Sequence, residues 1–152
     1  MYTLANMQDS IKKVEATRAQ RMATEPRRMT ADEKDALLAA YHPDYKEEGF
    51  IWFLEACDLN VMAIRRAMWQ MEHAGWFRYV KGFLIGRPLV HGQEMMGLDQ
   101  YHAVLDIIAH HNVPVIMDAD LGHIAPMLPL ISGSYANITA TGNNLVVDMK
   151  LK

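Results

Sequence analysis

Three short apolar runs alternate with two amphipathic segments in the middle of the chain, and this pattern constrains the fold more than any other feature. The runs cover residues 50–54, 80–85 and 113–117, and each has the length of a strand. Between them, residues 61–71 and 98–111 carry apolar side chains three or four positions apart, which predicts one apolar face on a helix. Strands that alternate with helices are typical of parallel βαβ units. The sequence therefore predicts an α/β fold with three parallel strands and crossover helices.

The segment before the first run differs in composition from the rest. Residues 1–48 are polar and poor in aromatic side chains, and they predict one helix over about 8–24, ended by Pro26, and a second over about 31–41. We interpret this segment as a helical N-terminal extension. The α/β domain is then expected to occupy residues 49–152.

The end of the chain has the alternating polarity of half-exposed strands. Residues 134–141 and 145–151 show this alternation, and Gly142-Asn143-Asn144 lies between them. Glycine and asparagine tolerate the left-handed backbone that tight hairpin turns require. We therefore expect a C-terminal β-hairpin after the parallel sheet.

Overall composition excludes several classes of protein. The chain has 152 residues, the length of one ordinary domain, and a net charge of −3, so no basic face for nucleic acid or an anionic membrane is expected. It has no apolar run long enough to cross a bilayer and no secretory signal pattern at its start. The single cysteine, Cys57, rules out an internal disulfide and fits a reducing compartment, where we interpret it as a packing residue. We expect a cytoplasmic protein that needs no cofactor.

Ionisable side chains follow the strands of the predicted sheet. Residues 50–54, FIWFL, are apolar throughout, which is typical of a strand covered on both faces, and they end at Glu55. Arg87 follows the second strand, and residues 118–123, DADLGH, follow the third. Because crossover connections bring the carboxyl ends of parallel strands to one edge, these side chains are expected to share a rim. Ligands bind at such edges in open α/β sheets.

The best-supported chemical pair on this rim is Glu55 with His123. A carboxylate beside a histidine fixes the imidazole tautomer and stabilises the imidazolium that forms when the ring takes a proton. Two other interpretations stay open for Glu55, which can be a helix N-terminal acid or the ion-pair partner of Arg87. His123 can equally be a surface histidine.

Metal binding is a weaker interpretation of the same segment. Asp118, Asp120 and His123 are possible ligands, and His110 and His111 are close in sequence. Adjacent histidines on an α-helix diverge by about 100°, so they rarely bind the same ion. The chain also has no HExxH or CxxC motif. We therefore expect no metal site.

Four segments in this order resemble the C-terminal domain of the LD-carboxypeptidase family, which includes the microcin C immunity peptidases. They are FIWFLEACD (50–58), AGWF (74–77), KGFLIGRP (81–88) and VPVIMDADLGHIAPMLPL (113–130). The resemblance implies a swivelling β/β/α-like domain from a serine peptidase with a Ser-Glu-His triad. It places Glu55 at the acid position and His123 at the histidine position. Arg87, on the same rim, is a candidate to bind a substrate carboxylate.

The chain departs from this family in one important respect. The family's nucleophile lies in a separate N-terminal domain, on a strand–turn–helix elbow with a Gly-Tyr-Ser-Asp type sequence. None of the serines here, Ser10, Ser132 and Ser134, has that context, and residues 1–48 lack the family's Gly-Gly-Asn-Leu type segment. We therefore expect no nucleophile in this chain and little activity from it alone.

Two functions from different classes follow from the resemblance. The first is one part of a peptidase that cleaves an amide next to a D-amino acid in murein peptides, or that detoxifies a peptidyl-nucleotide of the microcin C type. The second is a non-enzymatic module that associates with itself or a partner. A surface that the N-terminal domain normally covers would be bare, and we therefore expect a homodimer.

Overall fold

The computed structural model describes residues 12–20 and 28–151. The chain divides into two units, of which the first ends at Thr30 and the second begins at Ala31. In the first unit, residues 12–20 are helical, within the range predicted for the first helix. The remainder of that prediction, including Pro26, falls outside the described residues.

The second unit is built on the predicted parallel sheet. Strands β1 (Phe50–Leu54), β2 (Val80–Gly86) and β3 (Val115–Ala119) pair in parallel, in the order β1-β2-β3. The connections after β1 and β2 each return to the opposite end of the sheet, and the strand order is the same as the chain order. This confirms the predicted fold class.

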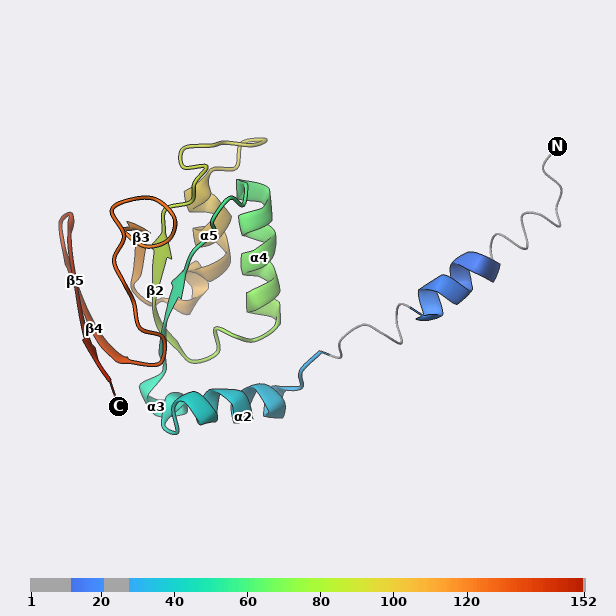
Figure 1. Cartoon of the computed structure of the whole chain (residues 1–152), viewed down its shortest axis with the longest axis horizontal. Helices are drawn as coiled ribbons and strands as arrows, with labels where there is room; N and C mark the ends of the chain where they lie inside the picture. Colours follow the sequence, from blue (N-terminus) through green and yellow to red (C-terminus); the bar gives the residue numbers. More distant parts are fainter. Residues whose placement is uncertain (1–11, 21–27, 152) are drawn as a thin grey trace. The chain divides into compact units, whose positions relative to one another are not determined.

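Helices cover one face of the sheet. Helix α4 (Val61–His73) connects β1 to β2, and helix α5 (Gln100–Ile108) with the short 3-10 helix η1 (Ala109–His111) precedes β3 (Figure 1). The predicted helix over 98–111 thus contains a change from α to 3-10 geometry. The main core lies between these helices and the sheet. Its buried members include Val61, Ile64, Met68, Phe77, Phe83, Val104 and Ile108.

The helix ends follow their sequence signals. The side chain of Asn60 accepts a hydrogen bond from the amide of Ala63, 2.9 Å away, and so caps α4. Gly75, at φ +76, follows the end of α4, and Asn112, at φ +53, follows η1. Both residue types adopt the left-handed backbone that ends helices at low cost.

A C-terminal hairpin and the loop before it lie on the opposite face. Strands β4 (Tyr135–Thr141) and β5 (Asn144–Lys150) pair antiparallel, as predicted. A second, smaller core forms there around three buried side chains. They are Leu84, Ala119 and Leu121, with Ile116, Leu130, Ile138 and Leu145 packed against them.

The hairpin leaves the β1 side of that face uncovered. Ile51 is 37% exposed and Phe53 is 40% exposed. The prediction that residues 50–54 are covered on both faces is therefore wrong, because the hairpin covers β2 and β3 instead. A cavity of about 590 Å³ remains there. Its lining residues come from β1, from the hairpin and from residues 37–48 before β1.

Helices α2 (Ala31–Tyr41) and α3 (Tyr45–Glu48) belong to the same compact unit as the sheet. Tyr45 is almost fully buried, with its ring centroid 5.9 Å from that of Phe50 and 5.2 Å from that of Tyr79. The unit therefore begins at Ala31 rather than at residue 49, because aromatic packing joins α3 to the start of β1.

Candidate active site

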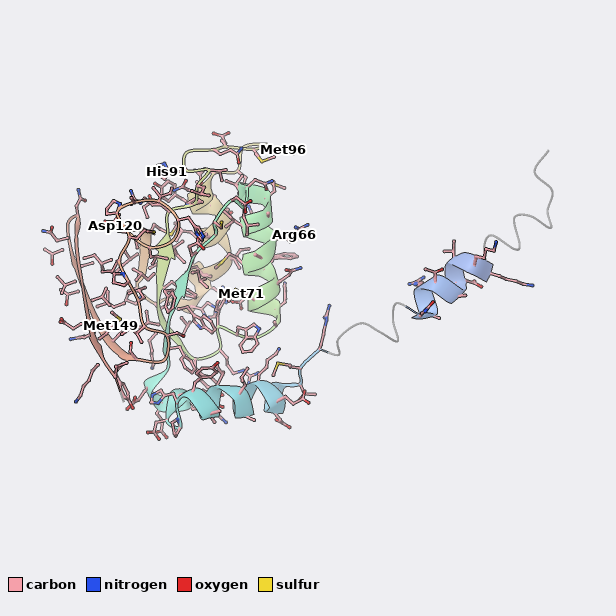
Figure 2. All side chains as sticks on the ribbon, viewed as in Figure 1. Arg66, Met71, His91, Met96, Asp120 and Met149 are labelled. Atoms are coloured by element: carbon pink, nitrogen blue, oxygen red, sulfur yellow. The ribbon has the colours of Figure 1, made fainter. Side chains whose placement is uncertain are left out.

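The three strand ends meet at one edge of the sheet, as the crossover topology requires. Glu55 directly follows β1, Arg87 directly follows β2, and residues 120–123 follow β3. Figure 2 shows Asp120 at this edge, at the same end of the domain as His91.

Glu55 and His123 form a hydrogen-bonded pair on this rim. The Nδ1 atom of His123 lies 2.8 Å from Oε1 of Glu55, although the two residues are 68 positions apart in the chain. The same carboxylate oxygen accepts a hydrogen bond from the amide of Cys57, 2.6 Å away, which holds the carboxylate in position. An ionised carboxylate can only accept, so Nδ1 carries the proton and Nε2 is left as a base.

Exposure differs between the two partners. The side chain of Glu55 is 25% exposed, whereas that of His123 is 60% exposed. The acid is therefore fixed by the fold, while the imidazole lies open to a molecule or protein surface that approaches the rim. This arrangement suits a base that acts on a group brought from outside.

Gly122 makes the contact between Glu55 and His123 possible. Its φ is +107°, a backbone conformation that residues with a side chain rarely adopt. A Cβ atom added at this position would lie 2.4 Å from Cγ of Glu55 and 3.0 Å from its Oε1. Only glycine lets the backbone before His123 pass so close to the carboxylate.

We expect Gly122→Ala to separate the two side chains. The new methyl group would displace the Glu55 side chain and strain the backbone, so the Nδ1–Oε1 hydrogen bond should be lost. The ¹⁵N chemical shifts of the His123 ring check this, because they report which nitrogen is protonated. Gly92→Ala is the matched control, since Gly92 also has a positive φ but a Cβ there meets nothing within 4 Å. Unchanged His123 shifts in Gly122→Ala would contradict the prediction.

Arg87 pairs with Asp120 rather than with Glu55. Its Nη2 atom lies 2.5 Å from Oδ1 of Asp120. The ion pair considered between Arg87 and Glu55 is therefore not formed. The Nε atom of Arg87 is buried, and within the described part of the chain it has no hydrogen-bond partner.

Asp118 lies at a bulge in β3. Leu84 is in register with Ile116 and Gly86 with Ala119, so one residue of β2 faces two of β3. Asp118 takes the strained position, at φ +55. The prediction that Asp118 lies in the turn after the strand is wrong, since β3 continues to Ala119.

Two residues that the sequence analysis did not select hold Asp118. Gln100, which is buried, donates to its Oδ1 atom at 2.7 Å, and the Tyr101 hydroxyl donates to Oδ2 at 2.5 Å. This hydrogen bond, with burial, raises the pKa of Tyr101 above its ordinary value. Tyr101 lies in the range 98–111 that was expected to form a helix with an apolar face, so the spacing of the residues gave no signal of this polar contact.

The structure does not bring Asp118, Asp120 and His123 together as a metal site. Two other groups in the described ranges 12–20 and 28–151 place three ligand atoms within 4.8 Å of one another. One is Glu55 with Cys57 and His123, which adds Cys57 to the rim pair, and the other is Glu72 with His110 and His111. Cys57, at φ +47, is free and only partly buried.

Comparison with known protein families identifies the domain. The family model for the LD-carboxypeptidase C-terminal domain matches residues 34–138, well over half of the chain. The chain belongs to this family. The match runs from α2 into β4 and includes Glu55, Arg87 and His123, so the resemblance predicted from the sequence is confirmed. A comparison with curated proteins gave no significant match.

This LD-carboxypeptidase C-terminal domain offers no segment that fits a bilayer crossing. Among residues 12–20 and 28–151, every helix is too short or too polar to cross one. The longest helix within residues 28–151 is α4, from Val61 to His73. A membrane-spanning helix needs about 20 consecutive apolar residues.

Proposed function

We propose that Glu55 and His123 are the acid and the base of a Ser-Glu-His triad in a serine peptidase. The substrate class is a murein peptide with an amide next to a D-amino acid, or a peptidyl-nucleotide of the microcin C type. The single observation that carries this proposal is the Nδ1–Oε1 hydrogen bond at the carboxyl edge of the sheet. Membership of the LD-carboxypeptidase C-terminal domain family supports it.

The geometry defines a role for each group in acyl transfer. Nε2 of His123 takes the proton of a serine hydroxyl as the serine oxygen attacks the amide carbonyl carbon. The C–N bond then breaks, and the imidazolium returns the proton to the leaving amine. Water cleaves the acyl-enzyme by the same route, with His123 again as the base. Throughout, Glu55 holds the ring through Nδ1 and stabilises its charged form.

The serine in this proposal comes from outside the described residues. Ser132 and Ser134 lie in the turn before β4, and the Ser134 hydroxyl donates to the carbonyl of Ile131 at 2.8 Å. Within residues 28–151, no hydrogen bond joins His123 to a serine. The exposure of the His123 side chain fits an interface at which a second surface supplies the nucleophile. Ser10 lies outside the described residues, and its sequence context is not that of a nucleophile elbow. These 152 residues alone are therefore expected to be inactive.

Arg87 is proposed to bind a carboxylate of the substrate. It lies at the same edge as His123, and its buried Nε atom is a donor without a partner in the described residues. Asp120 already contacts Nη2, so a substrate carboxylate would share the guanidinium with Asp120. Arg87→Lys tests this role, because lysine keeps the charge but has only one nitrogen donor group. KM should rise more than kcat falls.

A fluorophosphonate probe tests the location of the nucleophile, because it modifies only activated serines. The purified 152-residue protein should gain no adduct in its intact mass. The tagged chain isolated with its bound proteins from the cells that produce it should show an adduct on a second polypeptide. The same preparation should release D-alanine from a murein tetrapeptide.

Two histidine variants test whether the probe adduct depends on the proposed base. His123→Ala should remove the adduct, whereas His91→Ala, a histidine at the same end of the domain, should keep it (Figure 2). An adduct on Ser10, Ser132 or Ser134 that disappears in His123→Ala would place the nucleophile in this chain and contradict the proposal that a second polypeptide supplies it. If no polypeptide is labelled and no D-alanine is released, the peptidase proposal fails.

A second candidate function is self-association, and the uncovered face of β1 favours it. Ile51 and Phe53 are exposed beside the cavity of about 590 Å³, and β1 is an edge strand. Contiguous apolar surface of this kind marks interfaces. We expect a homodimer through this face, measured by size-exclusion chromatography with light scattering. Phe53→Asp should give a monomer, and a monomeric wild-type protein would exclude this function.

A further inference from the structure

Two adjacent histidines share one carboxylate on the side of the domain that the proposed triad does not use. Glu72 lies in the last turn of α4, and His110 and His111 form the end of η1. Oε2 of Glu72 is 2.8 Å from Nε2 of His111, and Oε1 of Glu72 is 3.3 Å from Nε2 of His110. One nitrogen from each ring and one carboxylate oxygen lie within 4.8 Å of one another.

The expectation that these histidines diverge is wrong. On an α-helix their side chains would point about 100° apart. Here they end a 3-10 turn, whose three residues per turn also separate adjacent side chains, by about 120°, so the side-chain torsions rather than the helix geometry bring the rings together. The two ring centroids are 4.1 Å apart, with only 35° between the ring planes. Both rings therefore reach the same carboxylate.

We propose that Glu72, His110 and His111 bind a zinc ion. Two imidazole nitrogens with one carboxylate oxygen are a ligand set that zinc accepts, with water at the fourth position. Ligand atoms about 2.0–2.1 Å from a tetrahedral ion are separated by about 3.3 Å. The observed N–O separations are 3.3 Å, to Oε1, and 2.8 Å, to Oε2, so one matches this value and the other is shorter, and the ion requires only small movements of the side chains.

The surroundings hold two of the ligands in place and leave the third accessible. The side chain of His111 is 17% exposed, and its ring centroid lies 6.2 Å from those of Phe77 and Phe83. Glu72 is 25% exposed, whereas His110 is 59% exposed. The ion can therefore enter from the His110 side. Once bound, it joins the end of α4 to the segment before β3.

The test is a titration of the full chain with zinc chloride alone, followed by calorimetry and thermal unfolding. Because the ion binds the folded state, a large excess over its Kd should raise Tm by at least about 5 °C. Glu72→Gln and His110→Ala should each weaken zinc binding by at least about tenfold. His110 is exposed, so its replacement should leave the fold intact.

Two controls separate this site from other ligands in the chain. His102→Ala removes a histidine that also contacts a carboxylate, Asp99 Oδ1 at 2.8 Å, but without a second imidazole. Cys57→Ser removes one member of the Glu55–Cys57–His123 group. Zinc binding should survive in both. This outcome does not depend on the proposed peptidase, because neither Glu72 nor the two histidines belong to the triad.

Three results would overturn the proposal. One is a wild-type protein that binds no zinc at micromolar concentrations. Another is binding that His110→Ala and Glu72→Gln leave unchanged. The third is binding that disappears in Cys57→Ser, which would assign the ion to the triad edge.

Discussion

Replacing His123 with alanine should lower the rate of D-alanine release by the assembled peptidase about 10⁴-fold or more. The imidazole is the base in both half-reactions, and no other histidine in the described residues contacts Glu55. The loss should appear mainly in kcat, because the side chain acts in the transition state rather than in substrate binding. Initial rates over a range of murein tetrapeptide concentrations measure it.

Glu55→Gln is the companion variant, and it should cost about 10⁴-fold in kcat. Glutamine keeps the size of the side chain and can accept a hydrogen bond, but it lacks the charge that stabilises the imidazolium. His91→Ala should retain wild-type kinetics. Its side chain lies at the same end of the domain and only approaches Asp118, 4.0 Å away. A Glu55→Gln enzyme with full activity would refute the role of Glu55 as the acid.

Replacing Phe77 with alanine should cause the largest loss of stability, about 3–5 kcal/mol in the free energy of unfolding. Phe77 is 1% exposed, and its ring lies edge-on to Phe83 and Trp52, with centroid distances of 5.0 and 5.9 Å. Removing it leaves a cavity between the sheet and its helices that the aromatic neighbours cannot fill. Urea denaturation followed by circular dichroism measures the change.

Trp69→Ala is the matched control for this prediction. Trp69 lies on α4 but is 57% exposed, and its ring contacts His73 rather than the core. Losing this larger ring should change the free energy of unfolding by no more than about 1 kcal/mol. Equal destabilisation by the two substitutions would mean that aromatic packing in the core is not what stabilises the domain.

Local signals predicted most of the secondary structure. Asp58 and Asn60 are both residue types that cap helices, and it is Asn60 that caps α4. Gly75 and Asn112 follow the ends of α4 and η1, because both residue types tolerate a positive φ. Helix α2 begins and ends at the predicted residues, 31 and 41. Each of these features depends only on residues a few positions apart.

The rim was also predictable, although its members are distant in sequence. Parallel strands joined by crossover helices bring their carboxyl ends to one edge whatever the side chains are. Glu55 directly follows the first predicted strand, and His123 follows the third after a short turn. The topology of the sheet therefore predicts that the two residues lie close together. Their roles in the peptidase remain a proposal.

The contacts that the sequence did not reveal depend on exact backbone paths. The bulge in β3 turns Asp118 toward α5, and nothing in the residues around it signals an extra residue in the strand. His110 and His111 likewise reach one carboxylate although they are adjacent in a 3-10 turn, a contact that depends on their side-chain torsions. A one-residue change in register redirects a side chain, and sequence periodicity does not resolve such changes.

The sequence by itself determined the α/β class, the three parallel strands and the edge that carries Glu55 and His123. These features follow from hydrophobic periodicity and from the handedness of crossover connections, which are local or topological. Only the tertiary structure decided which face of β1 is covered. Ile51 and Phe53 are as apolar as buried residues, but the hairpin packs over β2 and β3. Apolar side chains favour burial, but the packing of the hairpin against the sheet decides which apolar surfaces are covered.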